Sequence, residues 1–226
     1  MRSTGFWTRG GLAGLAVCAV ALITTFAAPC PADDRDRDLR RDFPIAAGKT
    51  LRLDLRWGEL HVEATDGDHI EIVVRADCHR NDRRCQERLE SLDVESDDRR
   101  DVLDLEVTGV SHWSNHGADL RVDMKVPRGH DLKIDMGAGE VEIESFESDL
   151  DVDLGAGEIH VRMPEQAVRD VELRAGVGDA ELKTPHGPVQ SDRHLLVGGG
   201  VSWDRGSGQA HVDCHVGAGE VSMRLD

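Results

Sequence analysis

The chain has 226 residues, of which 44 are acidic and 27 basic, so its formal net charge at pH 7 is −17. A charge of this sign repels nucleic acid and anionic lipid surfaces, and it favours solubility, cation binding or a basic partner. The length fits one domain or a repeat array and makes a second compact domain unnecessary.

The first 32 residues have the layout of a secretory signal peptide. Arg2 and Arg9 precede an apolar run over residues 11–28, and the segment contains no acidic residue. Small residues follow the run, which predicts cleavage after Ala27 or Ala32 and an exported mature chain. An uncleaved membrane anchor is the alternative. We expect a periplasmic, outer-surface or extracellular protein with no membrane span after cleavage.

The mature chain is predicted to begin with a flexible segment. Residues 33–42 (DDRDRDLRRD) include a single apolar side chain, which is too little to order a segment by burial. From Phe43 to Asp226, apolar and polar residues alternate with the period of two that is typical of strands, and long segments of helical period are absent. The sequence therefore predicts one all-β domain over residues 43–226.

The cysteines agree with an oxidising compartment. Cys78 and Cys85 lie in the polar stretch ADCHRNDRRCQERLE, which predicts a loop leading into a short helix. After export we expect these two residues to form a disulfide, with two free thiols as the alternative. Cys214 falls on the apolar side of an alternating segment, which is typical of a core residue. Cleavage after Ala27 would leave Cys30 available to pair with it.

One unit recurs within the strand pattern. Alternating apolar residues lead into a four-residue turn such as Gly-Ala-Gly-Glu, and the alternation resumes with the opposite parity, so that five positions separate the last inward residue from the next. Five copies keep this step, whereas a sixth lacks the acid and is one residue short. The glycines that the copies share are Gly58, Gly139, Gly157, Gly178, Gly200 and Gly219.

This recurrence predicts a stack of β-units. The last five shared glycines are 18 to 22 residues apart, and a period near 20 with one glycine turn per unit is typical of a β-solenoid. Glycine accepts positive φ at a corner and lets neighbouring coils approach closely. Residues 131–226 form the regular part, whereas residues 43–130, which largely lack the turn, form an irregular half. An antiparallel β-sandwich is the alternative architecture.

The run from Phe43 to Asp226 resembles a known family. It contains TLRLDLRWGELHVEA, KVPRGHDLKI and the repeated GAGE(V/I)xV, and these phrases are similar to the bacterial "putative adhesin" domain of unknown function. The resemblance implies a toastrack-like β-solenoid and a non-enzymatic envelope or surface domain. The loop between Cys78 and Cys85 and the strongly acidic balance depart from a generic member, and they leave the partner open.

The acids of the turns are the main candidates for binding. In a stack in register, Glu140 would lie about 4.8 Å from Glu158 on the next strand, followed by the acid of the next repeat, with the last acid beyond an interrupted coil. Such a ladder would attract arginine, lysine or Ca²⁺, and its alternative is a set of solvated carboxylates. The predicted ladder comprises Glu59, Glu140, Glu158, Asp179 and Glu220. We expect no cofactor, with Ca²⁺ as the single candidate.

Other chemistry has weak support. His211, Asp213 and His215 share one face of a predicted strand, but the ~7 Å between same-face neighbours is long for a shared ion. We therefore expect no metal there unless another coil contributes a ligand. Gly-x-Ser-x-Gly, His-Glu-x-x-His and phosphate-loop motifs do not occur in the sequence, so no catalytic residue is assigned.

The leading functional hypothesis is a non-enzymatic exported envelope or surface domain. It would act in adhesion, scaffolding or sensing through contacts with an unknown protein or a cell-surface partner. One alternative is a Ca²⁺-responsive binding module that uses the acidic turns. The other is a β-helix enzyme acting on polysaccharides, which would need paired carboxylates in a groove.

Overall fold

The computed structural model describes residues 36–78, 83–109, 118–190, 192–194 and 198–226. Contacts divide the chain into Met1–Ala32 and Asp33–Asp226, and every described residue belongs to the second unit. The predicted signal peptide and Cys30 lie outside the described residues. In the part of the chain that the structure describes, no helix is long and apolar enough to cross a membrane.

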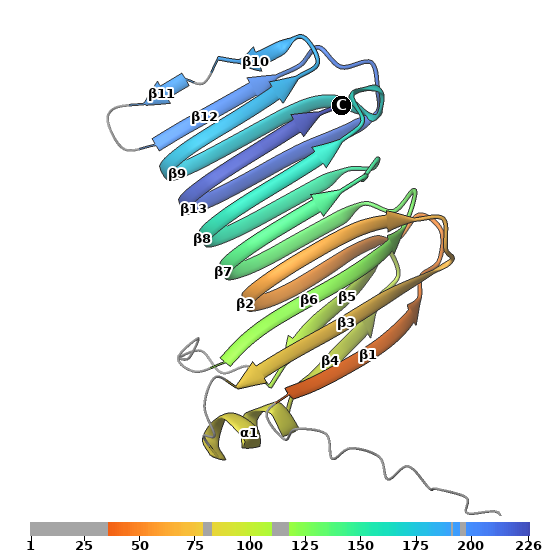
Figure 1. Ribbon diagram of the computed structural model, residues 1–226. Coiled ribbons are helices and arrows are strands. Elements are labelled where there is room, and N and C mark those ends of the chain that lie inside the picture. The colour runs from red at the N-terminus through yellow and green to blue at the C-terminus, as the bar shows by residue number, and fades with distance from the viewer. Residues whose placement is uncertain (1–35, 79–82, 110–117, 191, 195–197) are drawn as a thin grey trace, which may run out of the picture. The chain divides into compact units, whose positions relative to one another are not determined.

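Strands dominate the described residues. They are β1 (Asp36–Pro44), β2 (Thr50–Thr65), β3 (His69–Cys78), β4 (Asp93–Asp98), β5 (Val102–Thr108), β6 (Ala118–Pro127), β7 (Leu132–Glu144), β8 (Leu150–Met163), β9 (Val168–Thr184), β10 (Gly187–Val189), β11 (Asp192–His194), β12 (Gly198–Trp203) and β13 (Ala210–Leu225). The helices are α1 (Arg83–Glu90) and the 3₁₀ turn η1 (Glu165–Ala167). All the strands join one sheet of order β1-β3-β6-β2-β7-β8-β13-β9-β12-β11, with β4, β5 and β10 paired beside this path (Figure 1).

Five long strands, β2, β7, β8, β13 and β9, form a regular parallel stack. Each bends back on itself once at its glycine turn, so that it contributes two legs (Figure 1). In β8, Val152 and Leu154 before the turn and Ile159 and Val161 after it are all at most 4% exposed. The change of parity across the turn thus directs apolar residues of both legs into one core. The all-β toastrack-like fold is confirmed, and the parallel pairing excludes the antiparallel sandwich.

The order of the stack differs from the order of the repeats. We expected the unit of β9 to lie beside that of β8, but β13 lies between them, with Gly219 paired to Gly157 on one side and to Gly178 on the other. After β9 the chain forms β10 and β12, which pair antiparallel with the other edge of β9, and then returns as β13. Since β10 and β12 occupy that far edge, β13 fills the space between β8 and β9.

Strands β5 and β6 form a further unit that the repeat pattern did not reveal. β5 pairs in parallel with the first leg of β2, and β6 pairs in parallel with the second leg. Seven positions separate Leu53 from Leu60 in β2, whereas seventeen separate their partners Leu105 and Val122. The four-residue turn has therefore been replaced by a much longer connection, and residues 110–117 of it lie outside the described residues.

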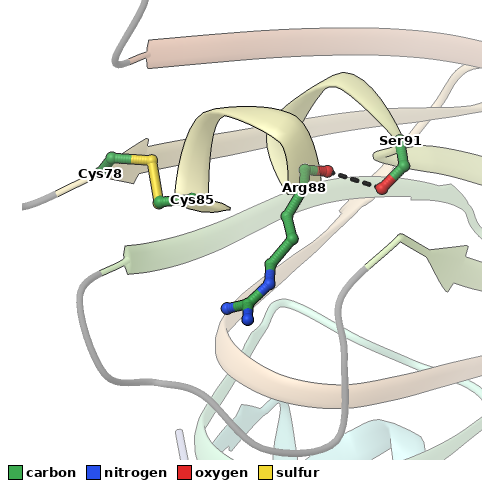
Figure 2. Close-up of a disulfide and its surroundings, with 4 residues drawn as sticks. All are labelled: Cys78, Cys85, Arg88 and Ser91. Carbon is green, nitrogen blue, oxygen red and sulfur yellow. Dashed lines mark hydrogen bonds between the residues drawn. A yellow bond between two sulfur atoms is a disulfide. The ribbon is translucent and has the colours of Figure 1, made fainter. Parts of the chain in front are cut away.

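Reversed strands bound the parallel stack on both sides. β3 and β4 pair antiparallel with β6 and β5, and α1 connects them. The predicted disulfide is confirmed: Cys78 at the end of β3 is bonded to Cys85 in α1, with 6.1 Å between the Cα atoms (Figure 2). Ser91 ends the helix, because its backbone N–H and its hydroxyl both donate to the carbonyl oxygen of Arg88.

The charged N-terminal segment is ordered from residue 36, which corrects the expectation of flexibility over residues 33–42. Residues 36–44 form β1, which pairs antiparallel with β3. Leu39 is buried in the core, and Arg41 forms an ion pair of 2.8 Å with Asp93. Arg37 donates to the carbonyl oxygens of Glu90 and Leu92. The composition of the segment did not predict this order, because its partners come from α1, β4 and the turn between them, more than 50 residues away.

Candidate functional site

The glycine turns lie side by side along one edge of the stack, which we call the turn edge (residues 56–59, 137–140, 155–158, 176–179 and 217–220). The third residue of each turn has a φ between 132° and 145°, a conformation that residues with a side chain rarely adopt. A Cβ at Gly157 would overlap the carbonyl oxygen of Gly139 on the neighbouring strand. Glycine is thus required twice, for its conformation and for the close approach of backbones.

Gly200 does not belong to this edge, contrary to the sixth repeat that we expected. It lies in β12, opposite Arg174 of β9 in an antiparallel pair. It is not among the described glycines with positive φ. The shortened, acid-free copy is therefore a strand that lies between one leg of β9 and β11, and its glycines allow close packing without forming a corner.

The middle of the turn edge is mostly small and apolar. Ala138, Ala156, Ala218 and Val177 occupy equivalent positions on neighbouring strands, and Val177 is 53% exposed. At the β2 turn the equivalent residue is Trp57, which is half-buried and packs on the core. Beside Trp57 lies an open groove of about 1180 Å³, which is lined by residues of β2, β3, β6, β7 and β8.

Five carboxylates follow the glycines, and we call them the carboxylate row. In spatial order they are Glu59, Glu140, Glu158, Glu220 and Asp179. All five are exposed, and neighbouring strands are about 4.8 Å apart. The expected order placed Asp179 beside Glu158 with Glu220 beyond it; the structure reverses these two because β13 lies between β8 and β9.

Counter-charges reach only part of the carboxylate row. Arg121 of β6 forms an ion pair with Glu59, and Nε2 of His160 lies 3.2 Å from a carboxylate oxygen of Glu158. Among the described residues, the side-chain carboxylates of Glu140 and Glu220 have no hydrogen-bond or ion-pair partner. Because like charges directly opposite one another in a sheet destabilise it, the row is a surface on which an added cation would be favourable.

Neutralising the two unpaired members is expected to stabilise the domain. The variant E140Q/E220Q removes repulsion from the row and should raise the free energy of unfolding by about 0.5–1 kcal/mol in low salt, and by little in 1 M NaCl. Urea unfolding at both salt concentrations measures this difference. The control E87Q/D131N removes the same charge from exposed positions elsewhere, and an equal gain in the control would contradict repulsion specific to the row.

A second run of acids lies on the other leg of β2, β7 and β8 and continues onto β5. Glu106, Asp54, Asp135 and Asp153 are direct neighbours on β5, β2, β7 and β8. Arg52 forms an ion pair of 2.7 Å with Asp135, and this contact raises the pKa of the arginine. At β2, β7 and β8 the turn edge is therefore flanked by carboxylates on both faces, whereas β13 and β9 have His215 and Arg174 at the equivalent positions.

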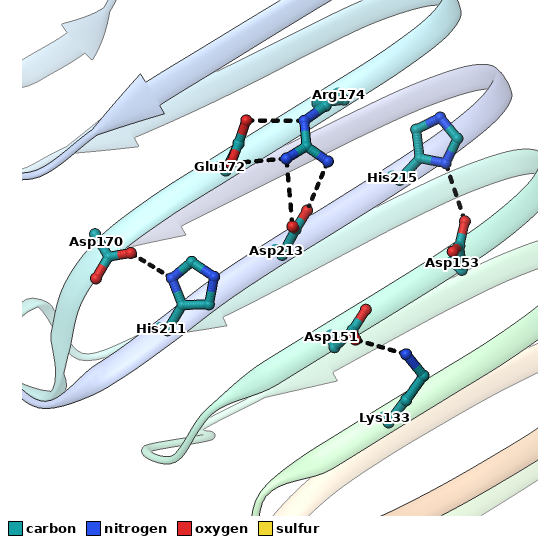
Figure 3. Close-up of polar contacts among 9 residues, drawn as sticks. All are labelled: Lys133, Asp151, Asp153, Asp170, Glu172, Arg174, His211, Asp213 and His215. Atoms are coloured by element: carbon teal, nitrogen blue, oxygen red, sulfur yellow. Dashed lines mark hydrogen bonds and ion pairs between the residues drawn. The ribbon is translucent and has the colours of Figure 1, made fainter.

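His211, Asp213 and His215 share a face of β13 but not a common partner (Figure 3). His211 bonds Asp170 of β9. Arg174, also of β9, lies 3.4 Å from Asp213, and Nδ1 of His215 lies 2.9 Å from Asp153 of β8. Since each side chain turns to a different neighbour, the three do not converge on one ion.

Ion pairs and hydrogen bonds between these neighbouring strands shift the pKa values of several side chains. The pKa of the Asp170 carboxyl is lowered, first by a hydrogen bond from Arg169 and then by His211. The pKa of Lys133 is raised by its 2.7 Å contact with Asp151 on the next strand (Figure 3). These exposed pairs are worth little individually, since solvent screens them. They describe a charged face of alternating sign rather than a reactive centre.

One arrangement of catalytic residue types was not foreseen. Nδ1 of His160 lies 2.7 Å from the hydroxyl of Ser222, and its Nε2 faces Glu158, so a serine, a histidine and an acid are linked. The sequence could not show this, because Ser222 reaches His160 only once β13 lies beside β8. Ser222 pairs in the ladder with both β8 and β9, so its surrounding backbone N–H groups offer no oxyanion hole.

The stack of bent parallel strands is the architecture of a toastrack domain, and the sequence match agrees. Residues 45–183 match the family described as the N-terminal domain of toast_rack, DUF2154. The chain belongs to this family. No curated protein matches the chain.

The chain is similar in fold to a solved bacterial structure. A "putative cell adhesion protein" from Clostridium sporogenes superposes with a TM-score of 0.52 at 14% identity, and the alignment covers 85% of this chain and 100% of that one. A "putative adhesin" from Bacteroides fragilis is 9% identical with a TM-score of 0.35, over 84% of this chain and 97% of that one. At such identities the first likeness shows a shared fold.

Proposed function

We propose that this protein is a non-catalytic, exported β-domain that acts in adhesion, scaffolding or sensing by binding a basic segment of a partner protein along the turn edge. The observation that carries the proposal is the carboxylate row: five exposed acids in register on five neighbouring strands. The row borders a strip of small apolar residues, so a partner would contact regularly spaced charges and apolar side chains together. The Cys78–Cys85 disulfide supports an oxidising compartment.

The physical basis is electrostatic complementarity. Acids at a fixed spacing create a field that a lysine- or arginine-rich segment can match residue by residue, which favours fast association and specificity. Surface charges of this kind are screened within about 8 Å at physiological ionic strength. Binding through the row should therefore weaken steeply as salt is added.

Capture from the native envelope tests this function. The wild-type protein, immobilised at low salt, is expected to retain a basic protein and to release it in 0.5 M NaCl. The row variant E140Q/E158Q/E220Q should lose this retention, and the control E63Q/E87Q/D131N, which removes three exposed acids elsewhere, should keep it. A partner retained equally by the row variant contradicts the proposed surface, and reproducible cleavage of a glycan by the wild type contradicts the non-catalytic role.

A Ca²⁺-responsive module is the second candidate, favoured by the absence of partners for Glu140 and Glu220 among the described residues. Carboxylate oxygens are the ligands that Ca²⁺ prefers, but it takes six to eight of them. If the row binds Ca²⁺, millimolar Ca²⁺ raises the melting temperature of the wild type and not that of the row variant. If the melting temperature of the wild type does not change with Ca²⁺, the Ca²⁺-responsive module is excluded, and binding of a basic partner protein stays as the proposed function.

A further inference from the structure

Strands β1 and β3 bring together three potential metal ligands away from the turn edge. Asp42 of β1 lies directly opposite Glu71 of β3, and His69 is two residues before Glu71, on the same face. One ligand atom from each of the three lies within 4.8 Å of the others. Asp42 is exposed, whereas His69 and Glu71 are partly buried. The set offers two carboxylates and one imidazole to a common point.

The orientation of His69 favours a ligand. Its Nδ1 lies 2.8 Å from a carboxylate oxygen of Asp68, and its Nε2 lies 3.5 Å from Oε1 of Glu71. When Nδ1–H donates to Asp68, Nε2 carries the free lone pair and faces the cluster. Histidines that bind a metal almost always donate the second ring N–H to such an acceptor, which is a carboxylate, a backbone carbonyl or water.

The charges around the cluster also favour the binding of a cation. Asp42 and Glu71 form a directly opposed pair of like charges, which destabilises an antiparallel ladder. The nearest fixed cation from the adjacent strand is Lys125 of β6, whose Nζ lies 4.0 Å from Glu71. A divalent ion between β1 and β3 would turn this repulsion into a cross-strand link. β1 also lies at one end of the sheet, and among the described strands it pairs with β3 alone.

We propose that Asp42, His69 and Glu71 bind a divalent first-row transition ion, Zn²⁺ foremost, and that this ion fastens β1 to β3. Asp68 acts as a positioning residue that orients His69. The imidazole nitrogen selects Zn²⁺ over Ca²⁺ and Mg²⁺, which prefer oxygen ligands alone. Three protein ligands leave at least one coordination position for water.

Calorimetric titration of the exported protein, purified without a polyhistidine tag, tests the site. We expect one Zn²⁺ to bind per chain and Ca²⁺ to bind far more weakly. H69A and D42N should abolish this binding, and D68N should weaken it by about 10- to 100-fold. H215A is the matched control, because Nδ1 of His215, like Nδ1 of His69, lies within hydrogen-bond distance of an aspartate carboxylate, and it should bind Zn²⁺ like the wild type.

Hydrogen exchange provides a second readout that does not depend on how tightly the ion binds. Saturating Zn²⁺ should slow exchange in residues 36–44 of the wild type and of H215A but leave H69A unchanged. Three results overturn the proposal: no uptake of Zn²⁺ by the wild type, equal uptake by H69A, or Ca²⁺ binding as tight as that of Zn²⁺. Because the row variant E140Q/E158Q/E220Q keeps all three ligands, its Zn²⁺ binding should be normal whether or not the proposed partner surface is correct.

Discussion

Replacing Gly157 by alanine is expected to destabilise the domain by at least about 4 kcal/mol, a large part of the roughly 5–15 kcal/mol that stabilises an ordinary domain. Two effects add. The φ of 138° is a conformation that alanine rarely adopts, and the new Cβ would overlap the carbonyl oxygen of Gly139. The obstacle is backbone held in register between β2 and β8, so it cannot move as a flexible side chain would. Circular dichroism and urea unfolding measure the loss.

Gly48 provides the control for this substitution. It also has a positive φ, 80°, but a Cβ there would meet no atom within 4 Å. G48A should therefore cost only the conformational penalty, about 1–2 kcal/mol. Equal destabilisation by the two variants would show that the close approach of the backbones at the turn edge contributes nothing beyond the dihedral angle.

Removal of the Cys78–Cys85 disulfide should have the second-largest effect, a loss of about 2.5 kcal/mol in the chain-entropy treatment of a loop of this size. The bond closes a short loop, with a sequence separation of 7, and both cysteines are buried against the core. It ties α1 to the end of β3, so its loss frees the segment that leads to β4. The variant C78A/C85A, compared with the oxidised wild type by urea unfolding, measures the difference.

The reduced wild type is the natural control for the disulfide. Under reducing conditions the wild type and C78A/C85A should unfold at similar urea concentrations, because both lack the crosslink. Cys214 cannot complicate the comparison by exchange, since it is fully buried and burial raises the pKa of its thiol far above the usual range. A variant as stable as the oxidised wild type would mean that the crosslink adds no stability.

The fold could be predicted largely from the sequence, because two local rules determine the structure of each repeat unit. Alternation identifies the legs, and the five-residue step across each glycine turn directs both legs into one core. The order of the units could not be predicted in this way. The turns at Gly139, Gly157 and Gly219 are chemically equivalent, so any unit fits beside any other, and only the path of the connection through β10 and β12 decides the order.

The residues of the candidate sites could likewise be predicted where they follow from the local repeat, but not where they are brought together by long-range strand pairing. The members of the carboxylate row follow from the repeat, but their order does not. Asp42, His69 and Glu71 could not be grouped, because the charged segment that contains Asp42 becomes a strand only through pairing with β3 and contacts with α1 and β4. His160 and Ser222 are 62 residues apart and become neighbours only through the placement of β13.

The position of β13 also has a consequence for how the chain reaches its folded state. β8 and β9 follow each other in sequence but do not pair with each other in the described sheet. β13 lies between them and pairs with both, and it begins 26 residues after β9 ends. A nascent chain that has emerged only as far as residue 209 therefore has two unsatisfied parallel edges facing a gap. Pairing of distant segments is slow because chain closure must precede the contacts. We expect the part of the stack that ends at β8 and the part that begins at β9 to join in one late step, when β13 pairs with both. Until that step the unpaired edges of β8 and β9 can pair with other chains.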